Sequence, residues 1–468
     1  MTYQLPQHIS KEKIFIVNRS AIDNRLDAQY YSANLDLSGF VKLSSVAIVK
    51  GGKRIPKGYG YSEDATPYHY LRVADMDSDV PVDVNSLMHI SNEVFDILER
   101  YEINEGELAI SIAGTIGKTT ILKNIPADKR VILTENCAKI LVKPNIELLS
   151  DYLKICLELP IVKKQLDLNY IQTTIPKLGL DKIVGIKLPP IPSMQKQQEI
   201  VDYVNEAYAQ KQAKETEAQQ LLDSIDDYLL KELGITIPEI KTEIGSRMFI
   251  VQHSELKGRY TPSLYKDAVN LHSTIYENRP LSHLAYVNPN TRLPYQDEKM
   301  MISFVPMESV NEIYAEINDN KDCPIAETKG FTRFQEGDLL WAKITPCMEN
   351  GKSAIAKDLI NGYGCGSTEF HVIRPKDDNL LVEYIHSLLH MKCVRQTAKL
   401  YFGGSAGQQR VATDFLDNFN VPLPPKAKQQ QIVNYIADIR TRAKALQTEG
   451  KAILENAKHK VEQMIIDK

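Results

Sequence analysis

Two stretches of the chain carry hydrophobic residues at alternating intervals of four and three, which is the spacing of helices that pack along a seam. In the first stretch the seam positions are Ile200, Val204, Ala207, Lys211, Lys214, Ala218, Leu221, Ile225 and Tyr228. In the second stretch they are Ile432, Ile436, Ile439, Ala443, Leu446, Gly450, Ile453 and Ala457. We therefore predict two long helices that pair antiparallel as a coiled coil. Two separate helices, each packed only on its own domain, are the alternative.

The first helix is expected from Ser193 to Leu233, about 60 Å at about 1.5 Å per residue, and to end at Gly234. A proline run precedes each helix, LPPIPS in the first case and VPLPPK in the second, and separates it from the preceding domain. Lys211 and Lys214 predict looser pairing in the middle of the first helix. The residues expected to hold the helices together are Ile200, Val204, Ala218, Leu221, Ile225, Ile432, Ile436, Gly450 and Ile453.

A shorter alternation, in AISIAGTIGKTTIL from residue 109, predicts a half-buried β-hairpin with Lys118 near its tip. The same stretch resembles a phosphate-binding loop because Gly114, Gly117 and Lys118 stand close together. That loop needs Gly-x-x-x-x-Gly-Lys-[Ser/Thr], and the position of its first glycine is Ile112 here. We therefore assign the glycines to the hairpin turn.

The chain repeats itself at offsets between 231 and 234 residues. Residues 15–32 align without a gap on residues 249–266, and KQQEIVDYV from Lys196 aligns on KQQQIVNYI from Lys428. The repeat predicts an α+β fold of two similar mixed domains and two long helices, related by a pseudo-two-fold. The expected segments are a domain at 1–188, a helix at 189–235, a domain at 236–420 and a helix at 421–468.

Composition describes an ordinary globular protein, with 43% hydrophobic and 25% charged residues among 468. No apolar run reaches the roughly 18–20 residues of a membrane span, and no signal peptide is evident, so we expect a cytoplasmic protein. The six cysteines form no C-x-x-C pair, which favours reduced thiols over a zinc ribbon. A net charge of −4 means that any nucleic-acid binding must come from local basic patches.

Such patches occur in both domains, where basic and amide side chains suit phosphates and base edges. In the first domain a Gly/Pro-rich loop also carries Tyr59 and Tyr61, and a solvated loop face is the alternative interpretation. In the second domain the stretch GGSAGQQR is the strongest candidate, with a helix entry as its alternative. The candidate DNA-contacting residues are Lys50, Lys53, Arg54, Lys57, Lys118, Gln172, Thr173, Lys177, Asn290, Arg292, Lys343, Lys352, Gln408, Gln409 and Arg410.

No catalytic or metal site is predicted. YFGGSAG, from Tyr401, is similar to the glycine motif of AdoMet enzymes but follows a helical segment, and no Asn-Pro-Pro-Tyr/Phe motif exists. His386 and His390 have a metal-like spacing, but the glutamate of H-E-x-x-H is absent and Lys154 and Glu158 stand at these positions in the first copy. We interpret both histidines as packing or surface residues.

The order of features resembles the specificity subunits of type I restriction–modification systems over the whole chain. The resemblance rests on two variable domains, each followed by LPPIP or PLPP, a glutamine pair and a long helix. It implies that each domain reads one half of a bipartite, asymmetric double-stranded DNA site. The helices would set the spacer and dock two methyltransferase subunits; whether restriction subunits join is left open.

The resemblance also implies that the chain binds no cofactor, since AdoMet, ATP and Mg would belong to partner subunits. Counting back from the proline runs places Thr173, Thr174 and Ile175 opposite Gln408, Gln409 and Arg410, so the first domain's contacts are expected to differ. Two alternatives stay open. One is a DNA methyltransferase or nuclease with an unrecognised catalytic site, and the other is a coiled-coil scaffold whose domains bind protein.

Overall fold

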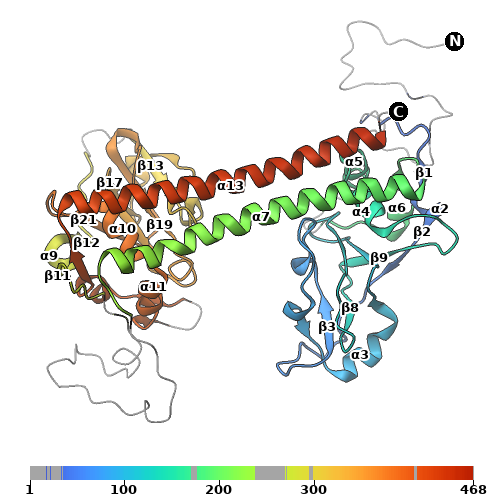
Figure 1. Cartoon of the computed structure of the whole chain (residues 1–468), viewed down its shortest axis with the longest axis horizontal. Helices are drawn as coiled ribbons and strands as arrows, with labels where there is room; N and C mark the ends of the chain where they lie inside the picture. The colour runs from blue at the N-terminus through green and yellow to red at the C-terminus, as the bar shows by residue number, and fades with distance from the viewer. Residues whose placement is uncertain are drawn as a thin grey trace, which may run out of the picture. The chain divides into compact units, whose positions relative to one another are not determined.

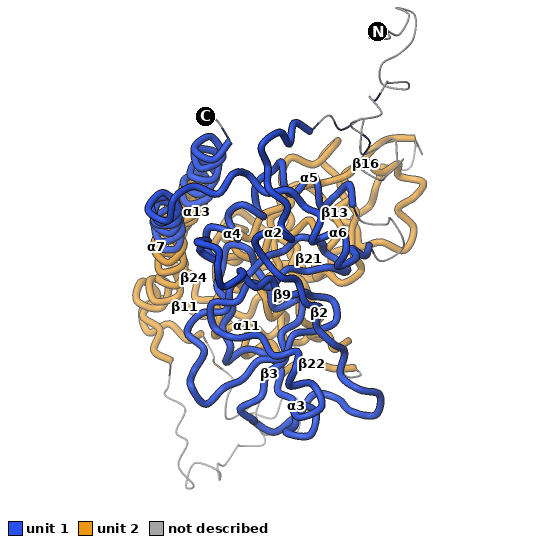
Figure 2. The backbone as a smooth tube through the Cα atoms, turned by 90° about the vertical axis from the view of Figure 1, so that its right-hand side faces the viewer, with its two compact units in different colours: residues 1–212, 450–468 blue, residues 213–449 orange. Residues whose placement is uncertain are grey.

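The computed structural model describes residues 35–169, 176–237, 271–294, 299–404 and 408–466, together with the single residues 17, 22, 33 and 269. The chain divides into two compact units (Figures 1 and 2). Unit 1 comprises Met1–Gln212 and Gly450–Lys468, and unit 2 comprises Ala213–Glu449. Each long helix therefore contributes one part to each unit.

Unit 1 is built from two four-stranded sheets, with strand orders β2-β9-β6-β7 and β4-β3-β8-β5. All neighbours are antiparallel except β3 and β8, which run parallel. Its strands are β1 Val41–Lys42, β2 Ala47–Gly51, β3 Tyr68–Leu71, β4 Met88–His89, β5 Glu102–Ile103, β6 Leu108–Ser111, β7 Thr119–Ile121, β8 Arg130–Leu133, β9 Cys137–Val142 and β10 Lys187–Leu188. Its helices are α2 Leu43–Val46, α3 Asn92–Leu98, α4 Ser150–Glu158, α5 Pro160–Asp167 and α6 Leu180–Val184, together with the short 3₁₀ helices η2 Val73–Asp75, η3 Val84–Ser86 and η4 Glu99–Tyr101.

Unit 2 repeats this topology, with sheets β12-β21-β18-β19 and β16-β13-β20-β17 and a parallel pair β13–β20 at the same place. Its strands are β11 Glu277–Pro280, β12 Ala285–Val287, β13 Met301–Val305, β14 Val310–Asn311, β15 Glu316–Ile317, β16 Lys321–Pro324, β17 Thr332–Gln335, β18 Leu339–Ala342, β19 Ser353–Ile355, β20 Tyr363–Gly366, β21 Phe370–Pro375, β22 Phe402–Gly403, β23 Arg410–Val411 and β24 Asn420–Leu423. Its helices are α9 Leu281–Leu284, α10 Val382–His390, α11 Lys392–Lys399 and α12 Thr413–Asp417, with η7 Met307–Ser309, η8 Ile325–Glu327 and η9 Ile360–Gly362. The predicted duplication is confirmed by these matching sheets, although the aligned segments 15–32 and 249–266 lie outside the described residues, apart from Val17 and Ile22.

The predicted hairpin is β6 and β7, paired antiparallel with Leu108 opposite Ile121. Gly114 and Gly117 lie in its turn at φ 77° and 81°, a left-handed conformation that favours glycine. The expected half-burial is wrong, because all four residues of β6 are buried. Leu108 packs toward α4 and α5, whereas Ala109 packs toward the second sheet, so both faces of the strand are covered.

The two long helices are α7, Met194–Glu232, and α13, Lys426–Ile466, drawn side by side in Figure 1. In unit 1 Ala207 packs against Leu454 and Ala457, so the beginning of α7 meets the end of α13. In unit 2 the rings of Tyr228 and Tyr435 stack at 4.0 Å between centroids, so the end of α7 meets the beginning of α13. Antiparallel pairing is therefore confirmed.

Burial follows the predicted seam closely. Of the nine residues expected to hold the helices together, Leu221 and Ile453 are half-buried and the other seven are buried. Lys214 forms an ion pair with Glu449, at 3.0 Å, as expected for a weakly apolar stretch of the seam. Each helix also packs on its own domain, since Ile200 joins the core of unit 1 and Ile432 joins that of unit 2.

A buried glutamine ties each helix to its domain. The Gln197 amide accepts a hydrogen bond from Leu149 N–H (2.9 Å) and donates to the carbonyls of Glu147 and Pro192 (both 2.9 Å). Gln429 makes the equivalent three bonds in unit 2. Because both side chains are fully buried, these bonds replace water and fix the direction in which each helix leaves its sheets.

Candidate nucleic-acid interface

Three chain segments meet at one edge of unit 1: the turn after β6, the β8–β9 turn and the segment before α6. Ile112 N–H donates to the Asn136 carbonyl at 2.8 Å, Gly114 N–H donates to the Pro176 carbonyl at 3.1 Å, and Lys177 forms a bridge with Ala113. Backbone bonds therefore hold together loops that are distant in sequence. Loops fixed in this way on a rigid scaffold are common binding surfaces.

The basic loop that follows β2 joins this edge. Lys53 N–H donates to the Leu133 carbonyl at 2.9 Å, and a Cβ on Gly52 would lie 2.1 Å from the Thr134 carbonyl oxygen, so this approach requires glycine. Arg54 Nε donates to a Glu135 carboxylate oxygen at 2.6 Å while its side chain stays 79% exposed. The guanidinium is thus oriented from one side and open to solvent on the other.

A surface cavity of about 310 Å³ lies beside this ion pair and is lined by Arg54, Tyr61, Arg72 and Asn136 among others. The Arg72 guanidinium lies 5.8 Å from the centre of the Tyr61 ring and is paired with Asp75 at 2.6 Å. Burial alone would raise the pKa of the Glu135 carboxyl, but hydrogen bonds from Arg54 and Thr134 outweigh it and lower this pKa. The cavity therefore combines fixed charges, an aromatic face and an amide, which suits a base edge.

Unit 2 builds the same meeting point with different side chains. Thr345 N–H donates to the Gln409 carbonyl at 3.0 Å, and Val411 N–H donates to the Lys343 carbonyl at 2.9 Å. Arg410 donates twice to the Glu369 carboxylate, from Nε and from Nη2, both at 2.8 Å. These hydrogen bonds hold the pKa of the Glu369 carboxyl below its usual value.

The two ends of GGSAGQQR, Gly403 and Arg410, pair antiparallel in β22–β23, so neither end is a helix entry; residues 405–407 lie outside the described residues. His371 anchors β23, because its Nε2 lies 2.9 Å from the Val411 carbonyl oxygen. Burial lowers the pKa of His371, which favours the neutral ring. Gln408 is exposed before β23 and Gln409 is half-buried.

The equivalence counted from the proline runs is wrong. The backbone of Lys177 forms an isolated β-bridge with Ala113 in unit 1, and the backbone of Arg410 forms one with Ile344 at the same place in unit 2. Lys177 therefore corresponds to Arg410. Helix α12 begins 233 residues after its counterpart α6, but the paired prolines of the second proline run lie 235 residues after those of the first. The second copy therefore has two extra residues between α12 and its proline run, which displaced the count.

Lys118 and Lys352 are engaged inside their units. The Lys118 ammonium donates to the Met76 carbonyl at 3.3 Å. The Lys352 ammonium donates to the carbonyls of Met307 and Val310 at 3.2 and 3.1 Å. Each lysine thus links the hairpin of the first sheet to the segment after the first strand of the second sheet, a structural role that sequence spacing did not reveal.

The remaining candidates are distributed unevenly. Lys50, Lys53 and Lys57 are exposed along β2 and its loop, as are Asn290 and Arg292 after β12. Thr291, between that last pair, accepts a hydrogen bond from Arg374, and no interaction in the described part of the chain joins Asn290 or Arg292 to the Arg410–Glu369 pair. Gln172 and Thr173 lie outside the described residues. Whether these side chains contact DNA stays a prediction.

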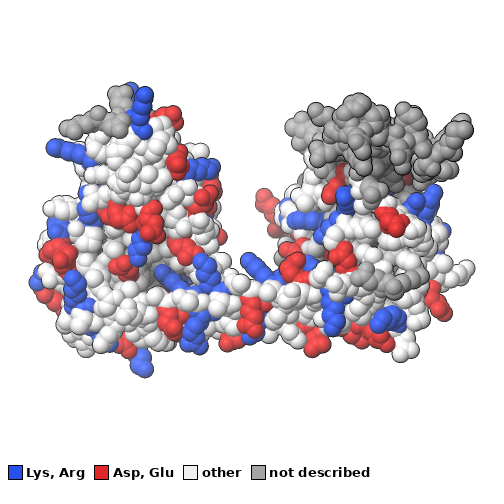
Figure 3. Space-filling view, turned by 90° about the horizontal axis from the view of Figure 1, so that it is seen from above, with Lys and Arg blue, Asp and Glu red and all other residues white. Residues whose placement is uncertain are grey.

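Charges of both signs are interspersed on the face that Figure 3 shows, in line with the net charge of −4. Sequence reasoning missed Asn136, Glu135 and Glu369, which belong to the turns TEN and STE between two buried strands. A polar triplet between strands usually marks only a turn. Its place beside the other two loops becomes visible only in the fold.

The histidine pair packs inside unit 2. The Ser353 hydroxyl lies 3.0 Å from His386 Nε2 and 3.5 Å from His390 Nδ1. Burial lowers the pKa of both rings, to about 3 for His390. Over the described ranges, no group of three or more His, Cys, Asp or Glu residues could hold a metal ion, and no helix is long and apolar enough to cross a membrane.

Two curated proteins of Escherichia coli are similar to part of the chain. The type I restriction enzyme EcoEI specificity subunit is 35% identical over 188 residues, which cover 40% of this chain and 31% of that protein. The type I restriction enzyme EcoAI specificity subunit is 34% identical over 197 residues, which cover 41% and 32%. The matched part thus spans about a third of the length of each relative.

A solved structure, from work on complex assembly and conformational transition of the type I R-M system, shares the fold. The match covers 91% of this chain and 96% of the solved one, at 15% identity and a TM-score of 0.50. The model of the type I restriction modification DNA specificity domain matches twice, over residues 36–223 and 276–456. Each match takes in one set of sheets and much of the helix that follows it. The chain therefore belongs to the type I restriction modification DNA specificity domain family.

Proposed function

We propose that this protein is the DNA-binding specificity subunit of a type I restriction–modification complex, acting in the cytoplasm. Each unit reads one half of a bipartite site in double-stranded DNA. The observation that carries the proposal is the repeated meeting of three loops at one edge of each unit, with different side chains in the two copies. Two similar modules then serve two half-sites, as in dimeric DNA-binding proteins.

The side chains at these edges favour an asymmetric target. Around the first edge stand Arg54, Glu135, Asn136 and Lys177, whereas Lys343, Glu369 and Arg410 stand around the second. Asparagine suits adenine, arginine suits guanine and a carboxylate accepts from cytosine in the major groove. Because these sets differ, the two half-sites differ in sequence.

Lys50, Lys53 and Lys57 supply phosphate contacts beside the first edge. All three are exposed on or next to one short loop, and exposed lysines contribute affinity that depends on salt but not on sequence. Their role is to hold the duplex against the unit while the cavity lined by Arg54 and Asn136 discriminates among bases.

The helices α7 and α13 fix the distance between the half-sites and dock two methyltransferase subunits. They run without interruption for 39 and 41 residues, and each has, as its fourth residue, a buried glutamine that ties it to its domain. The chemistry belongs to the partners: AdoMet serves methyl transfer there, and ATP and Mg serve restriction subunits if these join. The chain's own contribution is selection of the site.

The test compares modified adenines across the genome in cells with and without this gene. We expect one bipartite, asymmetric motif to be methylated only when the gene is present. Arg410→Ala should then broaden the motif at one position of one half. Identical methylation patterns in both strains would refute the proposal, and a protein-binding scaffold would become the better account.

A further inference from the structure

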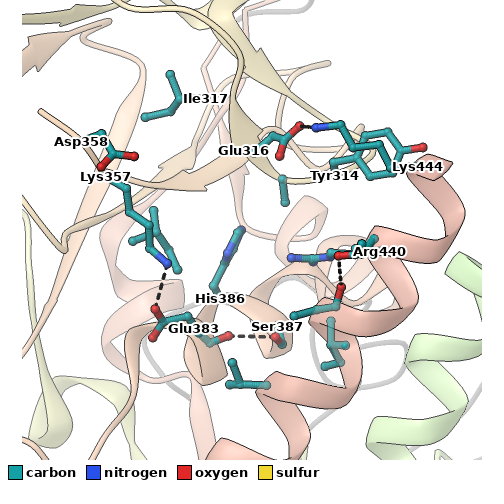
Figure 4. A pocket seen from close by; sticks show the side chains of 16 residues that line it. Tyr314, Glu316, Ile317, Lys357, Asp358, Glu383, His386, Ser387, Arg440 and Lys444 are labelled. Atoms are coloured by element: carbon teal, nitrogen blue, oxygen red, sulfur yellow. Dashed lines mark hydrogen bonds and ion pairs between the residues drawn. The ribbon is translucent and has the colours of Figure 1, made fainter. Parts of the chain in front are cut away.

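A second cavity, of about 460 Å³, lies within unit 2 between α13, α10 and the β14–β15 segment (Figure 4). It is distant in sequence from the loops of the candidate DNA edge, and neither Glu369 nor Arg410 lines it. The polar lining comes from Tyr314, Glu316, Lys357, Asp358, Glu383, His386, Ser387, Arg440, Thr441 and Lys444, and the aliphatic lining from Ala315, Ile317, Ile355, Val433, Ile436 and Ala437.

Arg440 is the unusual residue of this cavity. Its Nε is buried and has no hydrogen-bond partner, and the Tyr314 hydroxyl beside the same cavity is buried without a partner as well. The other two cations are already paired: Lys444 with Glu316, and Lys357 with Glu383 at 3.1 Å, as the dashed lines in Figure 4 mark. Among the cations that line this cavity in the described structure, Arg440 is therefore the one without an acceptor.

A buried guanidinium N–H without an acceptor is costly, because it loses water and gains no hydrogen bond in return. Burial lowers the pKa of Arg440 to about 10, against some attraction from Glu316, yet the group stays charged at neutral pH. The exposed Asp358 side chain, at the rim, makes no ion pair with it in the described structure. An anion entering the cavity would give the Arg440 Nε the acceptor that it lacks.

The first copy of the repeat indicates what kind of anion belongs there. Gln197 and Gln429 are equivalent, so Tyr208 occupies in α7 the position of Arg440 in α13. In unit 1 the Asp79 carboxylate accepts hydrogen bonds from the Tyr208 hydroxyl at 3.2 Å and from the Lys458 ammonium at 2.9 Å. The first copy thus carries its own carboxylate at this place.

Unit 2 has no carboxylate at the position equivalent to Asp79, and the Glu316 carboxylate that lines its cavity is paired with Lys444. Met76 and Val310 are equivalent, because their carbonyls accept hydrogen bonds from the equivalent lysines Lys118 and Lys352. Counting three residues on from each places Ile313 where unit 1 has Asp79. Ile313 is 46% exposed and supplies no acceptor. The same architecture therefore has a filled carboxylate position in one copy and an open one in the other.

We propose that this cavity binds a small organic acid, with its carboxylate on Arg440 and its alkyl part against the aliphatic wall. The wall of Ile317, Ile355 and Val433 favours an acid with a hydrocarbon body over an inorganic anion. Binding would join β14–β15 to α10 and α13 within unit 2. The proposal is independent of the DNA-reading role.

The test is calorimetric titration of the full chain with hexanoate, acetate, inorganic phosphate and 1-hexanol at constant ionic strength. Hexanoate should bind saturably, acetate more weakly, and hexanol and phosphate not measurably. Arg440→Met should weaken hexanoate binding at least about ten-fold, since a charge-assisted pair is lost. Arg442→Met is the matched control, because Arg442 lies two residues along α13 with its side chain 59% exposed, and it should bind as the parent does.

Absence of saturable hexanoate binding to the parent would overturn the proposal, as would tight binding of phosphate alone or equal losses in the two variants. Arg440→Met should also unfold at a urea concentration no lower than the parent, because it removes an unpaired buried charge. Should that variant fail to fold, Arg440→Lys takes its place, because it keeps the charge but loses the planar guanidinium. Loss of the guanidinium must then weaken hexanoate binding, and unchanged affinity would contradict the role given to Arg440.

Discussion

Replacing Gln429 with leucine tests how each helix is fixed to its domain. The amide accepts from Leu381 N–H at 2.9 Å and donates to the carbonyls of Asn379 and Pro424 at 2.8 and 3.0 Å. Leucine has a similar volume but offers none of these bonds. One N–H and two carbonyls would then be left without their partner.

The expected cost follows from that count. A buried polar group left without its partner costs roughly 1–3 kcal/mol, so three such groups predict a loss of roughly 3–9 kcal/mol if water does not enter. With an m-value of about 3 kcal/mol/M in urea, the unfolding midpoint should fall by roughly 1–3 M.

The assay is urea unfolding followed by tryptophan fluorescence. The chain has a single tryptophan, Trp341, which is buried in the core of unit 2. The signal therefore reports the unit that contains Gln429. Gln197→Leu removes the equivalent amide from unit 1, so it should change this tryptophan transition much less.

Gln430→Leu is the matched control, because its amide is exposed and bonds only to Asn434 one turn later. Its free energy of unfolding should stay within about 0.5 kcal/mol of that of the parent. If Gln429→Leu and Gln430→Leu shifted the midpoint equally, the buried amide would not be what holds the helix to the domain.

Three further predictions concern contacts, pH and length. Arg410→Ala should relax the target sequence at one position, whereas Lys53→Ala should weaken binding to all sequences alike and lower the dependence of log affinity on log salt by about one. Binding of cognate and random duplexes, with the methyltransferase present, checks both variants, and unchanged binding would remove these residues from the interface. The folded pKa of His390, about 3, lies below its ordinary value, so the contribution of this residue to the stability of unit 2 should be lost as pH falls below about 6.5, by about 1.4 kcal/mol per pH unit. His390→Leu should reduce this dependence of the unfolding free energy on pH in the tryptophan assay, and an unchanged dependence would contradict the burial argument. Inserting seven residues near Ala218 should lengthen the spacer by about three base pairs with unchanged half-sites, and an unaltered spacer in the methylation pattern would show that the helices do not set it.

Much of the architecture could be predicted from the sequence because it is periodic. Heptad spacing predicted the seam, and the repeat predicted two similar mixed domains. The half-burial expected for β6 failed because a second sheet covers its other face, which alternation along one strand does not reveal.

The candidate site was harder to predict because its residues act through long-range contacts. Lys118 and Lys352 had the charge expected of DNA contacts, but their ammonium groups are occupied by backbone carbonyls 42 to 45 residues away. The match of Lys177 with Arg410 was missed because two residues were inserted beyond α12. Asn136 stands in a short turn, and only the surrounding cavity distinguishes it from other turn residues.

The most direct test of the central claim is exchange of residues 1–188 for the equivalent domain of another specificity subunit, followed by genome-wide mapping of methylated adenines. The account predicts that one half of the recognised site changes, while the other half and the spacer stay as they were. A change in both halves, or in neither, would contradict the assignment of one half-site to each unit.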